Sequence, residues 1–356
     1  MNRKLYFILP VLNGGGAERV TLNYINQFKN KNEFDVTLIL FDKKSSQLDL
    51  LPDFINVVDL KTKSTKKSFF ALIKKISFQK SDIVFTSHSR VAVLISIVRL
   101  FKSFSHIARM QNTPSLEIKH KGFSRSKIFL YKMAFSYASK VIAQTRNMKD
   151  DAKKIFSLKD SHVVVLNNPL DKENINEKLM NSSSPFPVDE LSIIMSGRLH
   201  KNKAYNVAIQ ALSKVVQEYS SVKLYILGYD EGEKVRLEDL ILKLNLTQNI
   251  VFCDYTNNPY TYYNNAKLFI LSSIIEGFPN TLIENYYLNT PIVSTRCIPI
   301  IETLVKDGIN GYTVDVGDFE EMANKIILSI KNLDRKTIKN DVYEGSSLPK
   351  FLKETF

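Results

Sequence analysis

Residues 266–289 read AKLFILSSIIEGFPNTLIENYYLN, and they contain a strand, a loop and a helix in that order. The apolar run at 266–273 predicts a buried β-strand, because it is short and continuous. A helix is predicted to start near Asn280, a good N-cap residue, after a loop that contains Gly277 and Pro279. A buried strand that leads directly into a helix is typical of parallel sheets covered by helices.

The same alternation extends outward in both directions. It predicts an α/β protein with two Rossmann-like domains, each with its own parallel sheet, that face each other across a cleft. Ligands of such sheets bind at the carboxyl ends of the strands. Strands are predicted at residues 4–12, 34–42, 81–87, 140–145, 162–168, 191–199, 222–228, 249–255 and 291–295, and helices at 14–28, 205–219, 235–246 and 319–332.

A polar stretch that contains serines and prolines, 169–191, interrupts the alternation and predicts a domain linker. We therefore expect an N-terminal domain at 1–170 and a linker at 171–191. A C-terminal domain is expected at 192–335. Residues 336–356 are expected to pack back on the N-terminal domain.

Charge differs between the two halves of the 356-residue chain. Residues 1–165 hold 29 Lys and Arg against 12 Asp and Glu, whereas residues 166–356 hold 20 against 24. A basic half can attract an anionic membrane or a nucleic acid. The apolar run at 91–101 is too short to cross a bilayer. The start of the chain predicts a first buried strand rather than a signal peptide, and two distant cysteines favour a reducing compartment.

Two glycine turns follow predicted strands. In NGGGAER (13–19), Gly15 and Gly16 would let backbone N–H groups approach an anion at a helix start. A plain tight turn is the alternative, and the dinucleotide fingerprint would need a glycine at Arg19. In SGRLHKNKAYN (196–206), Arg198 and Lys203 suit a diphosphate, unless both are solvated surface cations.

Two glutamates bracket the loop of the opening stretch. Glu276 lies at the strand exit and Glu284 lies one turn into the helix. Carboxylates accept paired hydrogen bonds from diols, so one glutamate would hold a sugar ring and the other a ribose. The alternative is one helix-capping glutamate and one surface glutamate.

These motifs together resemble the retaining glycosyltransferases of the GT-B fold, family 4 (glycosyl transferases group 1). The resemblance covers nearly the whole chain, and its most specific part is the pair of glutamates around Gly-Phe-Pro-Asn. The matching stretches are GGGAER (14–19), NNP (167–169), GRLHKNK (197–203), LYILGYDEGE (224–233), SSIIEGFPNTLIE (272–284) and PIIETLVKDGINGYTV (299–314).

The resemblance implies that 192–335 binds the nucleotide sugar and that 1–170 faces the acceptor and the membrane. It also implies a role for each matching position. Arg198 and Lys203 would bind the donor diphosphate, and Glu284 would bind the ribose. Glu276, with the backbone N–H groups of Phe278 and Asn280, would hold the donor sugar. Gly15 and Gly16 would approach the phosphate from the other domain, and Glu302 would lie near the donor.

Three positions depart from the family pattern. The family usually has glycine where this chain has Ala204, and glycines in the loop where this chain has RCIPIIE (296–302). A histidine that the family often places near the sugar is replaced in RMQNTP (109–114) by Gln111. His88, which follows a predicted strand, is the other candidate for that role.

The family implies a UDP-hexose or UDP-N-acetylhexosamine donor and transfer with retention. No Asp-x-Asp triplet occurs in the chain, so we expect no metal and no other cofactor. The departing diphosphate would instead be stabilised by fixed cations.

The basic N-terminal half is expected to face the acceptor. Residues 61–80 and 119–140 combine lysines with apolar residues, which is typical of helices that lie on an anionic membrane surface, although ordinary domain helices with a solvated lysine face share this pattern. The expected acceptor is a lipid-linked glycan of a surface polysaccharide (O-antigen, capsule or lipopolysaccharide). The expected location is the cytoplasm, peripherally on the inner face of the cytoplasmic membrane.

Other functions are disfavoured by particular features. Nucleic-acid binding lacks a recognisable motif or stacking platform, and an oxidoreductase lacks the fingerprint glycine. A nucleotide-binding regulatory or partner subunit without chemistry is the main alternative.

Overall fold

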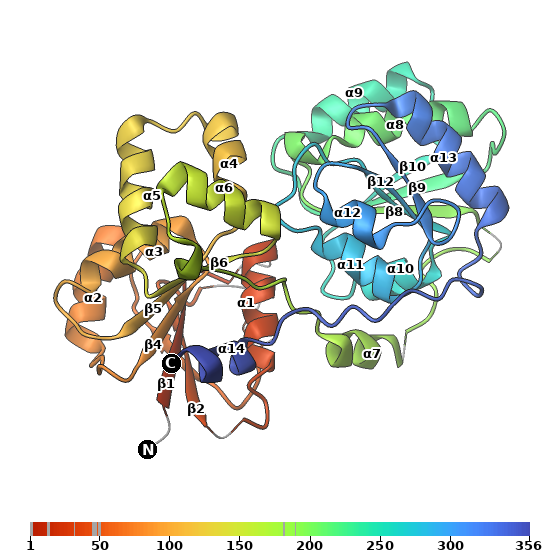
Figure 1. Ribbon diagram of the computed structural model, residues 1–356. Coiled ribbons are helices and arrows are strands. Elements are labelled where there is room, and N and C mark those ends of the chain that lie inside the picture. The colour runs from red at the N-terminus through yellow and green to blue at the C-terminus, as the bar shows by residue number, and fades with distance from the viewer. Residues whose placement is uncertain are drawn as a thin grey trace. The chain divides into compact units, whose positions relative to one another are not determined.

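A computed structural model gives the fold of the chain (Figure 1). The structure describes residues 3–12, 15–31, 33–44, 48, 51–180, 182–188 and 190–356, without the side chains of residues 120 and 121. The chain divides into two compact units. Unit 1 contains residues 1–169 and 344–356, and unit 2 contains residues 170–343.

Unit 1 is built on a seven-stranded sheet with the order β3-β2-β1-β4-β5-β6-β7, in which each described pair of strands is parallel. Residues of β1 alternate between two cores: Leu5, Phe7 and Leu9 pack on one face, and Tyr6 and Ile8 on the other. Both faces are therefore buried. The strands are β1 (Arg3–Leu9), β2 (Phe34–Leu40), β3 (Asn56–Asp59), β4 (Ile83–Thr86), β5 (Ser105–Arg109), β6 (Lys140–Ala143) and β7 (Val163–Val165).

Helices cover both faces of this sheet, with α1 and α14 on one face and α2 and α3 on the other (Figure 1). The C-terminal helix α14 is held beside α1, because the Gln27 side chain accepts from the Leu348 N–H at 2.8 Å and donates to the Ser346 carbonyl at 3.0 Å. The helices are α1 (Gly16–Asn26), α2 (Thr65–Lys75), α3 (Ser89–Val98), α4 (Pro114–Lys121), α5 (Arg125–Tyr137), α6 (Arg146–Phe156) and α14 (Leu348–Thr355).

Unit 2 repeats the plan with a six-stranded sheet of the order β10-β9-β8-β11-β12-β13, again with parallel pairs. Ile193 and Met195 of β8 face one core, and Ile194 faces the other. The strands are β8 (Ser192–Ser196), β9 (Lys223–Leu227), β10 (Ile250–Cys253), β11 (Leu268–Leu271), β12 (Ile292–Thr295) and β13 (Gly311–Val314).

The segment predicted as a linker contains a helix, α7. Its Ile175 is fully buried in a core of unit 2, together with Phe186 from the same segment. The helices of unit 2 are α7 (Lys172–Met180), α8 (Tyr205–Val215), α9 (Lys234–Lys243), α10 (Tyr260–Asn265), α11 (Asn280–Tyr287), α12 (Ile300–Leu304) and α13 (Phe319–Asn332), with a 3₁₀ turn at Lys201–Lys203.

Strand order identifies where each sheet can bind a ligand. The order reverses between β1 and β4 in unit 1 and between β8 and β11 in unit 2. Connections leave such a point in opposite directions, so a crevice opens outside the carboxyl ends of the two strands. In unit 2, Lys203 follows β8 and Glu276 follows β11, so the predicted site residues lie at the switch point.

Candidate functional site

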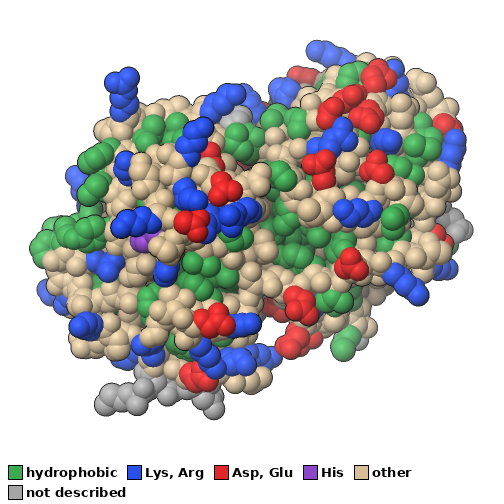
Figure 2. Space-filling view, viewed as in Figure 1, with side chains coloured by type: hydrophobic (Ala, Val, Ile, Leu, Met, Phe, Trp, Pro, Cys, Tyr) green, Lys and Arg blue, Asp and Glu red, His purple; other side chains and the backbone are tan. Residues whose placement is uncertain are grey.

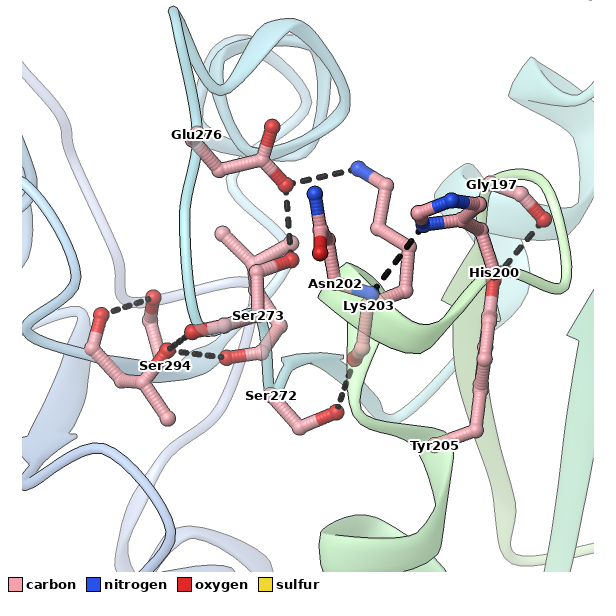
Figure 3. Close-up of polar contacts among 11 residues, drawn as sticks. Gly197, His200, Asn202, Lys203, Tyr205, Ser272, Ser273, Glu276 and Ser294 are labelled. Carbon is pink, nitrogen blue, oxygen red and sulfur yellow. Dashed lines mark hydrogen bonds and ion pairs between the residues drawn. The ribbon is translucent and has the colours of Figure 1, made fainter. Parts of the chain in front are cut away.

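Two loops meet at the switch point of unit 2: the β8 loop (197–204) and the β11 loop (272–279). The Ser272 hydroxyl donates to the carbonyls of Lys203 at 2.8 Å and Ala204 at 3.0 Å. The Ile274 N–H donates to the Asn202 carbonyl at 2.8 Å. These bonds fix the two motif loops to each other (Figure 3).

Lys203 and Glu276 form an ion pair across these loops. The Lys203 Nζ lies 2.6 Å from the Glu276 Oε1, which also accepts from the Ser273 hydroxyl at 2.7 Å (Figure 3). The two side chains are 23% and 11% exposed. Since both are partly shielded from water, their geometry is better fixed than that of a surface pair. A cation and a carboxylate are therefore held together at the mouth of the sheet.

The Glu276 charge acts on its neighbours. Burial, and secondly the Glu276 carboxylate, raise the pKa of the Cys297 thiol to about 12. The same two causes raise the pKa of the Tyr205 hydroxyl, which donates to the Gly197 carbonyl at 2.8 Å. Both side chains are therefore neutral at physiological pH, and Lys203 is the cation that balances Glu276.

Arg198 lies in the same loop with a different partner. Its Nη1 donates to the Glu231 Oε1 at 2.7 Å, and its side chain is 53% exposed. Arg198 and Lys203 thus share the β8 loop, but they form ion pairs with separate carboxylates, Glu231 and Glu276. Sequence reasoning missed Glu231, although it lies within LYILGYDEGE, one of the matching motifs.

Ala204 stands where the family usually has glycine, and its backbone conformation gives the reason for that glycine. Its backbone is left-handed, with φ of 46° and ψ of 44°. Glycine adopts this conformation without strain, whereas other L-residues lose about 1–2 kcal/mol. The usual glycine at this position therefore has a conformational reason, and the alanine retains the turn at some cost.

The β11 loop continues into α11. Asn280 is the first helical residue and Pro279 the N-cap, so the expectation that Asn280 caps the helix is wrong by one position. The Asn280 N–H donates to the Phe278 carbonyl at 3.0 Å, a bond it would have to release or share to hold a sugar. The Phe278 side chain is buried, 5% exposed, so only its backbone is suited to a ligand.

The remaining predicted residues of unit 2 differ in exposure. Glu284 lies on α11 and is 4% exposed, so it is a buried carboxylate and not the surface glutamate of the alternative interpretation. Glu302 lies on α12 with an exposed side chain. None of the polar contacts described for Glu276 includes Glu302.

The predicted residues of unit 1 lie at the carboxyl ends of β1, β4 and β5. Gly15 caps α1, and its N–H donates to the Glu18 Oε2 at 2.9 Å, so a carboxylate occupies the helix start where a phosphate was expected. Gly16 begins the helix, and Asn13 and Gly14 lie outside the described residues. His88 caps α3, and burial together with nearby arginines lowers its pKa to about 4. The Gln111 carbonyl accepts from Gln144 at 2.8 Å.

Two family models match consecutive parts of the chain. The model described as Glycosyltransferase Family 4 matches residues 14–174, and the one described as Glycosyl transferases group 1 matches residues 176–342.

Similar proteins were found at the sequence and structure levels. An uncharacterized glycosyltransferase of Methanocaldococcus jannaschii is 33% identical over 75% of this chain and 66% of its own length. A Campylobacter jejuni N-acetylgalactosaminyltransferase, whose name specifies a diphospho-undecaprenol acceptor, is 28% identical over 95% of this chain and 93% of its own length. The crystal structure of Anabaena HepE in complex with UDP has a TM-score of 0.74 and 18% identity, covering 94% of this chain and 92% of that one.

Proposed function

Because this chain belongs to the glycosyl transferases group 1 family and has its GT-B fold, we propose that it transfers a sugar from a UDP-sugar to a lipid-linked glycan. The donor sugar is a hexose or an N-acetylhexosamine, and transfer occurs with retention. The product belongs to a bacterial surface polysaccharide, and the reaction takes place at the inner face of the cytoplasmic membrane.

The names of relatives support this class of acceptor. The Campylobacter jejuni relative acts on a diphospho-undecaprenol glycan. A Staphylococcus aureus relative, 28% identical over 84% of the chain, is a capsular polysaccharide glycosyltransferase, and an Erwinia amylovora relative acts in amylovoran biosynthesis. The HepE complexes with UDP and UDP-glucose support a UDP-linked donor.

The observation that carries the proposal is the Lys203–Glu276 pair at the switch point of unit 2. In the donor, the sugar and the diphosphate share one bond, so their binding groups must also be neighbours. Lys203 would contact the diphosphate, and Glu276 would hold the sugar hydroxyls. Because the Lys203 Nζ and the Glu276 Oε1 are only 2.6 Å apart, one can contact the diphosphate and the other the sugar of the same donor molecule.

Chemistry would then consist of charge stabilisation. The bond between the anomeric carbon and the diphosphate oxygen breaks, and its electron pair leaves with the diphosphate. The acceptor hydroxyl forms the new bond and loses its proton to the departing diphosphate. Lys203 and Arg198 would stabilise the negative charge that develops on the leaving group. We propose that these cations act without a bound metal, since the sequence has no Asp-x-Asp triplet.

A transfer assay tests the proposal against the alternative of a nucleotide-binding subunit without chemistry. Purified chain would be mixed with membrane extract and each of several radiolabelled UDP-sugars, and lipid-extractable label would be counted. We expect one donor to label lipid with the intact chain and not with Lys203→Ala. Binding of UDP without transfer from any donor to any extract would favour the non-catalytic alternative.

For membrane docking, the structure supports only part of the two stretches expected, 61–80 and 119–140. In residues 61–80, Leu72, Ile76 and Phe78 face the core and are at most 7% exposed, so these three apolar side chains are not available to lipid. No helix among the described residues has the length and hydropathy to span a bilayer.

An apolar surface that remains exposed in unit 1 is formed by α2, by the end of α3 with the turn after it, and by α5 (Figure 2). We propose that this docking surface contacts the membrane, aided by nearby lysines and arginines. It comprises Phe70, Ile97, Leu100, Phe101, Phe129, Leu130, Met133 and Tyr137, which are 43–70% exposed.

A further inference from the structure

Arg109 is a buried cation without an acidic partner. It ends β5, and its residue is 2% exposed. The Nη2 donates to the Asn168 Oδ1 at 2.6 Å, and the guanidinium also hydrogen-bonds the Tyr24 hydroxyl. Its Nε and Nη1 are buried and have no hydrogen-bond partner. Within the described part of the chain, no carboxylate forms an ion pair with it.

Such an arrangement is costly unless something compensates the charge. A buried ion without its counter-ion loses several kcal/mol relative to water. Its two protein partners are neutral, because Asn168 carries no charge and burial raises the pKa of Tyr24 to about 12. The protein groups around Arg109 therefore supply hydrogen bonds but no negative charge.

The start of α3 follows β4, the strand next to β5. Thr86 of β4 pairs with Ala108 of β5, which places the backbone of Arg109 level with that of Ser87, one residue before the N-cap His88, and the Arg109 charge is close enough to act on the His88 imidazole. The N-terminus of α3 has no side-chain cap and no acidic residue in its first turn. The free N–H groups and the dipole of a ten-residue helix attract an anion.

His88 completes the cluster. Its Nδ1 is buried without a hydrogen-bond partner. Burial and the charges of Arg109 and Arg90 lower its pKa to about 4, so it is neutral at pH 7 and can donate one hydrogen bond. The carboxyl ends of β4 and β5 thus gather unused donors of three kinds.

We infer that Arg109, His88 and the first turn of α3 bind an oxyanion of the phosphate class in unit 1. A guanidinium suits the geometry of phosphate better than an ammonium does. The proposed function assigns neither Arg109 nor the first turn of α3 to the donor, although the resemblance leaves His88 as one of two candidates for a contact with the sugar. The inference holds whichever sugar is transferred. A phosphate group of the acceptor or free phosphate could supply the anion.

Inorganic phosphate is the first probe, measured by calorimetry on the full chain. All proteins would carry Lys203→Ala, which weakens phosphate binding at the proposed donor site. We expect one phosphate to bind, and Arg109→Gln to weaken it at least tenfold. The matched control Arg125→Gln removes an exposed charge from the start of a different helix of the same unit, α5, and should change affinity less than threefold. Absence of binding, or equal binding with Arg109→Gln, would overturn the inference.

A second measurement tests the inference even if the Arg109→Gln variant does not fold, because it does not use that variant. Hydrogen exchange of the otherwise unmodified Lys203→Ala chain should slow at residues 86–92 when phosphate is added, and unchanged exchange there would overturn the assignment to α3. A water-soluble prenyl diphosphate then distinguishes the sources. Displacement of phosphate by this compound indicates the acceptor, whereas phosphate that stays bound indicates a site for the free ion.

Discussion

At the scale of single residues, Lys203 is the side chain on which the proposed chemistry most depends. Its Nζ is held by Glu276, whereas Lys201 in the same 3₁₀ turn is exposed. Lys203→Ala should lower kcat by roughly 10²–10³, because a fixed charge near the leaving group is lost. Lys201→Ala is the matched control and should stay within about threefold. Steady-state transfer assays measure both, and equal losses would contradict the assignment.

Glu276 and Glu284 should have separable effects. Glu276 contacts Lys203 and Ser273 in the loop, whereas Glu284 is buried in α11. Glu284→Gln should mainly weaken binding of free UDP, by about tenfold to a hundredfold, since a charge-assisted hydrogen bond contributes about 1.5–3 kcal/mol. Glu276→Gln should leave UDP affinity nearly intact and sharply reduce transfer. Calorimetry beside transfer assays would reject this if both variants lost UDP affinity equally.

The sequence predicts which residues matter better than it predicts their partners. Lys203 and Glu276 were singled out because each follows a buried strand, and strand order then brings them together. The pairing of Arg198 with Glu231, and of Gly15 with Glu18, depends on the paths of loops after the strands. No periodicity encodes those paths, so both carboxylates were missed.

At the scale of elements, Gly228 determines how closely β9 can approach β8. Its φ is 147°, and a Cβ there would lie 2.0 Å from the Gly197 carbonyl oxygen. Gly228→Ala should therefore lower the free energy of unfolding by about 3 kcal/mol or more. Gly232→Ala is a control with φ of 94° and open space, and should lose only about 1–2 kcal/mol. Urea denaturation compares them, and similar losses would exclude the steric explanation.

The docking surface gives a second prediction at this scale. Phe129 and Met133 lie one turn apart on α5 and are 60% and 47% exposed. Replacing both with Asp should reduce binding to vesicles that contain anionic lipid at least tenfold, because apolar burial is lost and negative charge is added. Val235→Asp, at a 72% exposed site of α9, is the control. Unchanged co-sedimentation of the double variant would exclude this surface.

Elements with strong periodicity were predicted closely, and short or polar ones were missed. The helix predicted at 319–332 coincides with α13. The missed β3 is a four-residue strand without a fully buried residue. The missed β5 reads SHIAR, and its His106 and Arg109 are buried through bonds to Thr86 and Asn168 that no sequence pattern reveals. Tertiary partners, rather than local preference, make that strand.

At the scale of the whole molecule, the two units differ in their response to acid. Unit 1 holds His106, whose pKa is lowered to about 3 by burial and by Arg99, and His88, whose pKa is lowered to about 4. Both pKa values lie below the ordinary histidine value of about 6.5. As pH falls, the two histidines are therefore protonated in the unfolded chain before they are protonated in the folded chain. Their contribution to stability is complete above pH 6.5 and is lost as pH falls toward 4 and then 3.

In that window each histidine lowers the free energy of unfolding of unit 1 by up to about 1.4 kcal/mol per pH unit. Acidification from pH 6.5 to 5 should therefore lower it by about 4 kcal/mol at most. Because each unit has its own cores, unit 1 should lose hydrogen-exchange protection before unit 2. His106→Asn should make this loss shallower, because the buried group no longer titrates, while His200→Asn, at an exposed position of unit 2, should change nothing. Earlier loss of protection in unit 2, or an unchanged pH dependence with His106→Asn, would show that other groups control acid unfolding.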